Sequence, residues 1–214
     1  MNVIDLTHTI SVNMPVYPGT EAPSLSVACT VEKNGFKETL LHMFSHTGTH
    51  MDAPAHMFKN GTPLDVFEAS QFVGSAVVID CTELNEGERI GMTFIERCRE
   101  LTEKADFLLF RTGWDKKWGT AAYFGDFPCI SPEVADFIVD TGKKGVGLDV
   151  ISIDPITGSG FDNHRKLLSQ NTIVIIENLC NLDTLGSGLF TFIAAPLKFE
   201  NADGAPVRAF AVKE

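Results

Sequence analysis

Two apolar stretches, GVGLDVISI at residues 145–153 and TIVIIENL at residues 172–179, decide the expected fold. Each is a short run rich in Val and Ile, which is typical of a strand buried on both faces in the middle of a sheet. Two similar runs, FVGSAVVID at 72–80 and ADFLLFRTG at 105–113, lie nearer the N-terminus. The sequence therefore predicts a sheet in which these four runs are interior strands.

Helices are expected between these runs. Thr93 and Glu96 have the spacing of a capping box, which predicts a helix that opens there and continues to about Lys104. Ser131, followed by proline and glutamate, predicts a second helix with proline in its first turn, ending near Gly142. Strands that alternate with helices are typical of α/β folds.

Hairpins are expected near both ends of the chain. Residues 24–45 contain two β-rich runs joined across an Asn-Gly pair, a strong turn signal. Residues 190–199 and 205–212 form another β-rich pair around a short turn at 201–204. Because these strands follow one another directly, the sequence predicts a single α/β domain over residues 1–214 with a mixed β-sheet and flanking helices.

The composition is that of an ordinary globular protein, with 44% hydrophobic and 21% charged residues in a chain of 214. A formal net charge of −11 argues against a nucleic-acid partner, because binding phosphates requires clustered Lys and Arg. No run reaches the roughly 18 apolar residues of a membrane span, and the N-terminus lacks a signal-peptide pattern. Five scattered cysteines without a CxxC pair indicate reduced thiols. We therefore expect a soluble, cytoplasmic protein.

The chemistry is concentrated in residues 46–56, HTGTHMDAPAH. The chain has six histidines, and His46, His50 and His56 all fall within this segment, where uniform scatter would place roughly 0.3. Such clustering is typical of metal ligands. The alternative interpretation is a polar loop in which the histidines only form hydrogen bonds.

Strand geometry favours the metal interpretation. Side chains of an extended chain alternate between two faces, so the polar groups at even positions from His46 to His56 would share one face. A helix would align His46 with His50 but would turn Asp52 away. In a straight strand His46 and His50 would lie about 13 Å apart, too far to share an ion. We therefore expect a bend at Gly48, which lacks a Cβ.

The expected ligand set is imidazole nitrogen and carboxylate oxygen. Zn²⁺ prefers such ligands, and Mn²⁺ or Fe²⁺ can also take them. Three protein ligands leave one coordination position open for water, as catalytic zinc sites do. The segment therefore predicts a catalytic rather than a structural metal site.

The same residues resemble the signature HxGTHxDxPxH of the cyclase-like metal hydrolases, the family that contains bacterial kynurenine formamidase. Other segments that resemble family landmarks are DLTHTI at 5–10, VYPGT at 16–20, RTGWDKKW at 111–118, GLDVISIDP at 147–155 and IENL at 176–179. The resemblance runs along most of the chain. It implies a swivelling β/β/α fold and a homodimer or homotetramer.

The resemblance also implies roles for the signature residues. His46, His50 and Asp52 would bind a first ion, and Asp52 would bridge to a second. His56 would be the proton donor and acceptor. Retention of His56, which need not touch an ion, favours catalysis over metal storage.

Three residues outside the signature are implicated by the same resemblance. His164 and Glu177 occupy the places of the remaining metal ligands. Glu177 ends an apolar run, where an ion would offset the cost of burying its charge. Tyr17 stands where kynurenine formamidases typically carry a Trp that lines the substrate pocket, so it is the expected substrate-binding residue.

The implied activity is hydrolysis of a small amide, as in an arylformamidase, with metal-activated water attacking the carbonyl. The expected cofactor is one or two divalent ions, Zn²⁺ first and Mn²⁺ second. An isatin-type lactam or another small cyclic amide or ester is the alternative substrate. Two other classes would use the same ligands: a metal-dependent lyase or cyclase that stabilises an enolate, and a metal-binding module without turnover.

Overall fold

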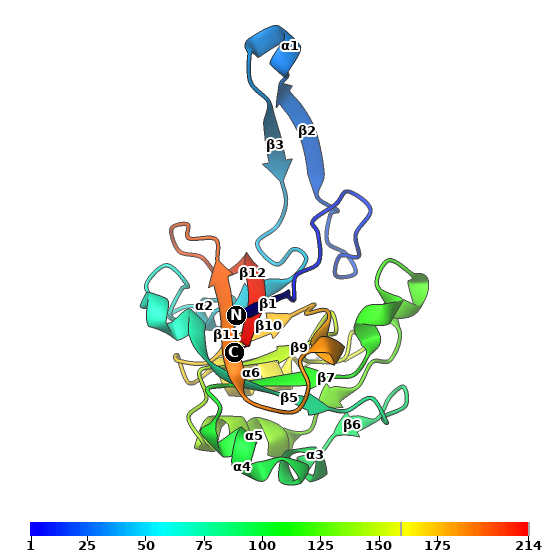
Figure 1. Ribbon diagram of the computed structural model, residues 1–214, viewed down its shortest axis with the longest axis vertical. Helices are drawn as coiled ribbons and strands as arrows, with labels where there is room; N and C mark the ends of the chain where they lie inside the picture. Colours follow the sequence, from blue (N-terminus) through cyan, green and yellow to red (C-terminus); the bar gives the residue numbers. More distant parts are fainter. Residues whose placement is uncertain (159, 214) are drawn as a thin grey trace.

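Seven strands close into a barrel in the computed structural model, which describes residues 1–158 and 160–213 (Figure 1). In order around the barrel they are β4 (His50–Asp52), β10 (Val174–Glu177), β9 (Gly145–Leu148), β7 (Phe107–Arg111), β5 (Val73–Asp80), β11 (Phe190–Pro196) and β12 (Gly204–Lys213). β4 pairs with both β10 and β12, and this double pairing closes the sheet. β1 (Asn2–Asp5) pairs farther along β12. The predicted mixed sheet is confirmed; its closure was not predicted, because it depends on one three-residue strand.

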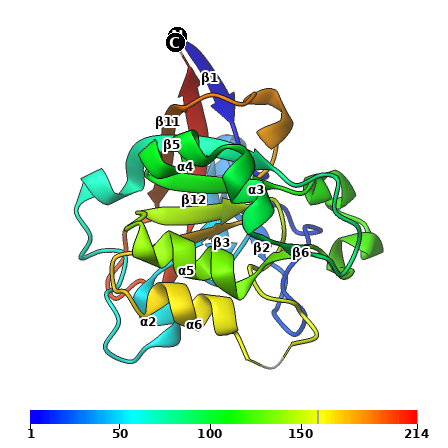
Figure 2. The ribbon, with the colours of Figure 1, turned by 90° about the horizontal axis from the view of Figure 1, so that it is seen from below.

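The parallel strands carry the helices. β5, β7, β9 and β10 are parallel neighbours, whereas β4, β11 and β12 pair antiparallel. The connections between the parallel strands contain α3 (Met92–Arg97), α4 (Arg99–Lys104), α5 (Pro132–Asp140) and α6 (Asp162–Leu168). These helices lie together on one side of the barrel (Figure 2). Parallel pairing requires such crossovers, which explains the alternation of strand and helix in this part of the sequence.

Alternation along the strands produces two apolar cores. On β7, Phe107 and Leu109 belong to the core inside the barrel, while Leu108 and Phe110 belong to the core beneath the helices. All four side chains are fully buried. A strand buried on both faces has no polar positions, so it is a continuous apolar run in the sequence.

A long hairpin projects from the barrel (Figure 1). Its strands β2 (Ser24–Cys29) and β3 (Glu38–His42) pair antiparallel, as predicted. The tip is not a two-residue turn but the one-turn helix α1 (Val31–Asn34). The Thr30 side chain caps the start of this helix, and Gly35 ends it with φ 78°. Every residue of β3 is exposed.

The predicted helix starts were right at one position and wrong at the other. The helix after Ser131 begins at Pro132, as expected. Thr93 and Glu96, however, form no capping box, because the chain already enters α3 after Gly91, without a side-chain cap. The helix is also interrupted at Cys98, which separates α3 from α4.

The remaining elements are short. They are α2 (Pro54–Met57), the parallel pair β6 (Arg89–Ile90) and β8 (Cys129–Ile130), and the 3₁₀ turns η1 (Ala69–Phe72), η2 (Trp114–Lys117), η3 (Ala121–Phe124) and η4 (Leu182–Thr184). Across the described residues, every helix is too short or too polar to cross a membrane.

Candidate metal centre

The site lies on the outer face of the barrel, where β4 and β10 run side by side. Met51 and Ile176 are paired in register and belong to the interior core. Because side chains alternate along a strand, the neighbouring His50, Asp52 and Glu177 project to the opposite, outer face. His50 lies directly across from Glu177 in the pairing.

The predicted bend in the signature segment is present at Gly48, whose φ is 68°. It turns His46 back onto Asp52, and Nδ1 of the imidazole lies 2.6 Å from Oδ1 of the carboxylate. The expected continuous strand is wrong beyond Asp52. His56 lies on the one-turn helix α2, because Pro54 occupies the first helical position there, as proline prefers.

Residues far apart in the sequence meet at Asp52. His164 on α6 places Nε2 3.6 Å from Oδ2 of Asp52 and 3.4 Å from Oε1 of Glu177. His50 places Nε2 3.3 Å from Oδ1 of Asp52 and 3.5 Å from Oε2 of Glu177. The fold therefore brings together all five residues expected as ligands, and only His46 among them is more than slightly exposed.

In each of the three imidazoles around Asp52, the ring nitrogen that faces away from Asp52 lies within hydrogen-bond distance of another oxygen. Nδ1 of His50 lies 2.8 Å from the carbonyl oxygen of Gly48. Nδ1 of His164 lies 2.7 Å from Oδ2 of Asp154, and Nε2 of His46 lies 3.0 Å from Oδ2 of Asp203. An outer carboxylate or carbonyl that orients a histidine is the usual surrounding of a metal ligand, because it sets which nitrogen faces the ion.

The two outer carboxylates were not identified as site residues from the sequence. Asp154 is buried, and it accepts hydrogen bonds from the backbone N–H groups of Asn163 and His164 in addition to its contact with the His164 ring. Asp203 was expected only as part of a turn. No local signal could have found it, because its position depends on the pairing of β12 with β4.

Asp52 has the environment of a metal ligand. Its Oδ2 is buried and has no hydrogen-bond partner among the described residues. Burial tends to raise the pKa of this carboxyl, but His46 and His164 hold it well below its ordinary value. An ionised carboxylate with a vacant buried oxygen, surrounded by imidazole nitrogens and a second carboxylate, is a donor set that suits a divalent cation.

His56 differs from the three held imidazoles. The nearest carboxylate oxygen, Oδ2 of Asp203, lies 4.0 Å from its Nδ1, which is beyond hydrogen-bond distance. Burial lowers the pKa of His56 to about 4, so the ring is neutral at pH 7. Burial likewise opposes the charged form of His46, yet Asp52 and Asp203 raise its pKa to about 10. His56 is therefore a neutral imidazole with no hydrogen-bond partner for its ring among the described residues.

Gly204 is required for the position of His46. A Cβ at residue 204 would overlap the His46 ring, so no larger residue fits while the imidazole keeps its place. Gly204 also pairs directly with Asp52 in the barrel. The backbone of β12 therefore lies directly against the His46 ring.

The cavity above these residues has a volume of about 300 Å³, at the small end of ligand pockets. Its walls are largely apolar or aromatic side chains: Pro15, Val16, Tyr17, Phe44, Ile151 and Phe161. Tyr17, the residue expected to bind substrate, is one of these wall residues. His56, His164 and Glu177 line the cavity as well, together with the other ionisable groups of the centre.

The remaining histidines lie outside the cavity lining. His8 stacks on Trp118 with ring centroids 3.8 Å apart, and His42 is exposed on the hairpin.

Comparisons with known proteins place these features in a family. The family model described as "Putative cyclase" matches residues 4–155. A kynurenine formamidase of Bacillus cytotoxicus is 33% identical over 208 residues, covering 96% of this chain and 95% of the relative. The structure of isatin hydrolase A from Labrenzia aggregata bound to benzyl benzoate matches with a TM-score of 0.88 and 27% identity, covering 98% of this chain and 93% of that one.

A further solved structure, described as a potential metal-dependent hydrolase with cyclase activity, matches with a TM-score of 0.79 and 28% identity over 98% of this chain and 96% of that one. The family match spans most of the chain, and the similarity to the formamidase extends from end to end. The chain therefore belongs to the cyclase family.

Proposed function

We propose that the protein is a metal-dependent hydrolase of a small amide, with an activity like that of an arylformamidase. The observation that carries this proposal is the vacant, buried Oδ2 of Asp52, with His50, His164 and Glu177 gathered around it. Without a cation, three imidazoles and two carboxylates would be buried together with incomplete pairing, which is costly. A divalent ion removes that cost.

The residues that would hold the ion are His46, His50, Asp52, His164 and Glu177. Zn²⁺ suits their nitrogen and oxygen donors best, and Mn²⁺ is the second choice. When bound, one or two such ions lower the pKa of a water molecule and polarise the substrate carbonyl. Asp154, Asp203 and the carbonyl of Gly48 keep the three imidazoles aimed at the ion.

His56 would transfer the protons. Its neutral ring can take a proton from the attacking water and return it to the departing nitrogen, so that amide and water become carboxylic acid and amine. Its ring centroid lies 4.0 Å from that of His46 and 6.0 Å from that of His164, so it borders the proposed ion site. Tyr17 would form one wall against an aryl group.

A lactam of the isatin type is the second candidate substrate. The specific support is structural, because the match to isatin hydrolase A has a TM-score of 0.88 over nearly the whole chain. Tyr17 in place of the Trp expected in kynurenine formamidases also leaves more room beside the substrate ring. The same residues would serve both reactions, since each breaks a carbonyl–nitrogen bond.

The test is a hydrolysis screen of N-formylkynurenine, isatin and simple aryl esters, after chelation and after return of Zn²⁺ or Mn²⁺. We expect turnover of at least one substrate that is lost on chelation and restored by metal. His56→Ala should retain bound metal and lose turnover, whereas His42→Ala on the exposed hairpin should change neither. Bound metal without turnover of any substrate, or full activity in His56→Ala, would contradict the proposal.

A further inference from the structure

We infer that Asp203 makes the cavity selective for substrate charge, so that an aryl substrate with a protonated amine is preferred over one with a carboxylate. The inference rests on the proposed function, because it names the substrate class of the same cavity. It is carried by the position of Asp203 and by the charges that line the cavity.

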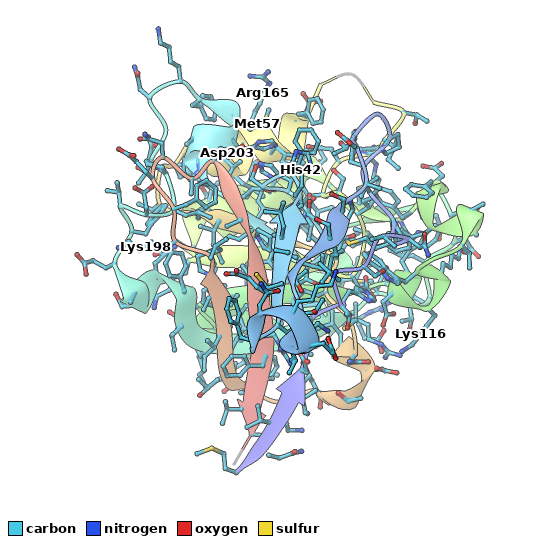
Figure 3. The ribbon with its side chains drawn as sticks, turned by 90° about the horizontal axis from the view of Figure 1, so that it is seen from above. His42, Met57, Lys116, Arg165, Lys198 and Asp203 are labelled. Atoms are coloured by element: carbon cyan, nitrogen blue, oxygen red, sulfur yellow. The ribbon has the colours of Figure 1, made fainter. Side chains whose placement is uncertain are left out.

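The cavity lining contains carboxylate side chains but no Lys or Arg among the described residues. A substrate carboxylate would therefore find no Lys or Arg side chain in the described part of the lining. In the view of Figure 3, Lys116 and Lys198 lie towards the edges of the molecule, whereas Arg165 is labelled nearer to Asp203 but is not among the residues that line the cavity. Apart from the ionisable groups of the metal centre, Asp203 is the single charged residue of the lining within the described chain.

Asp203 is held in place from two sides. Its carbonyl oxygen accepts a hydrogen bond of 2.9 Å from the N–H of Ala53, and the next residue pairs with Asp52. Its carboxylate contacts Nε2 of His46 at 3.0 Å and the hydroxyl of Ser45 at 3.3 Å. The side chain nevertheless remains 45% exposed. A fixed carboxylate that is only partly covered can meet a ligand without reorganising.

The negative charge of Asp203 is not cancelled by the centre. With one divalent ion bound, the two negative charges of Asp52 and Glu177 would balance the charge of the ion. The centre itself would then carry little net charge. Without an ion His46 is protonated and pairs with Asp203. An ion bound at Nδ1 would take the place of that proton, so in the metal-loaded protein His46 would be neutral and would donate from Nε2 without cancelling the carboxylate charge. The charge of Asp203 therefore acts on whatever occupies the cavity.

The apolar walls strengthen this effect. Tyr17, Phe44 and Phe161 exclude water from the space that an aryl ring would fill, and Coulomb interactions grow as the local dielectric falls. Because Asp203 is partly solvated, we expect a preference of roughly fivefold for a cationic over a neutral substituent, and a similar penalty for an anionic one.

The experiment compares three N-formylanilines whose para substituents are aminomethyl, ethyl and carboxymethyl. The first two match in size and differ in charge, and the third, which is larger, carries the opposite charge. The measured quantity is the ratio of kcat/KM among the three in the metal-loaded enzyme. A ratio separates charge preference from any general loss of activity, which matters because Asp203 also holds His46. In Asp203→Asn the ratio of amine to carboxylate substrate should fall by roughly tenfold or more.

Glu200→Gln is the matched control, because Glu200 is exposed just before the same turn, lies outside the cavity lining, and loses the same charge. Its ratio should equal that of the unmodified protein. Equal shifts in both variants would mean that net charge, not Asp203, sets the preference, and would overturn the inference. So would an unchanged ratio in Asp203→Asn.

A binding measurement decides the inference even if the formylanilines are not hydrolysed. Calorimetry of benzylamine against benzyl alcohol should show tighter binding of the amine, and Asp203→Asn should abolish the difference. Equal binding of the two ligands to the unmodified protein would overturn the charge preference. Failure of all metal-dependent hydrolysis, by contrast, would count against the proposed function and leave the calorimetric result standing.

Discussion

The projecting hairpin and the candidate metal centre are neighbours in the sequence but are stabilised in opposite ways. In the hairpin, Val27 is 64% and Leu40 62% exposed, and the strands contact mainly each other. In the centre, Asp52 is 1% and Glu177 4% exposed, and their partners come from three other parts of the chain. The pairing of the hairpin joins residues that are close in the sequence, whereas the centre forms only once the barrel has closed.

The largest effect is expected from substitution of Asp52, the carboxylate in the middle of the centre. Asp52 contacts all three held imidazoles, so Asp52→Asn should abolish metal binding and lower kcat/KM by roughly 1,000-fold or more, since the ion supplies several kcal/mol of charge stabilisation. Metal analysis and a kinetic assay measure this. Leu40→Ser in the hairpin should alter neither quantity. Full metal occupancy in Asp52→Asn would contradict the expectation that metal binding depends on the centre and not on the hairpin.

The next effect tests whether barrel closure positions a ligand. Gly204→Ala should displace the His46 ring and weaken metal binding by roughly 100-fold, at the upper end of what loss of ligand orientation costs. Gly188→Ala is the control, because a Cβ there meets no atom within 4 Å. Competition with a chelator gives the affinity. Equal affinities in the two variants would show that His46 is not constrained by β12.

A smaller effect is expected from the outer carboxylate that holds His164. Asp154→Asn keeps an oxygen to accept the backbone hydrogen bonds but weakens the hold on Nδ1 of His164, so metal affinity should fall by about tenfold. Asp140→Asn, at the exposed end of α5, is the matched control. If Asp154→Asn binds metal normally, the Asp154 side chain contributes packing and does not orient His164.

The smallest effect concerns histidines outside the centre. Burial lowers the pKa of His8 from 6.5 to about 4, so the unfolded chain binds its proton first and stability falls as pH drops from 6.5 towards 4. His8→Phe keeps the stack on Trp118 and should remove roughly 1 kcal/mol of that loss, allowing for solvent screening. Urea unfolding at pH 7 and pH 4.5 measures it. His42→Phe on the hairpin is the control, and an equal change there would refute the assignment.

The difference between the two regions also explains which structural predictions succeeded. The buried strands and the hairpins were predicted because their signals are local: apolar runs, turn residues and period-two patterns. The capping box at Thr93 was wrong because Gly91 already provides a helix start two residues earlier. The prediction that the polar side chains from His46 to His56 share one face of a strand was wrong, because Pro54 begins a helix within the segment.

By itself, the sequence determined the chemistry of the candidate centre: the clustered histidines and Asp52, the bend at Gly48, and the resemblance that added His164, Glu177 and Tyr17. Only the tertiary structure decided which other residues orient the ligands and line the cavity. Asp154 and Asp203 become site residues because β4 pairs with two strands and α6 packs across the outer face of the barrel. Such contacts join residues up to 157 positions apart, and no local pattern records them, since packing of whole elements sets which distant side chains meet.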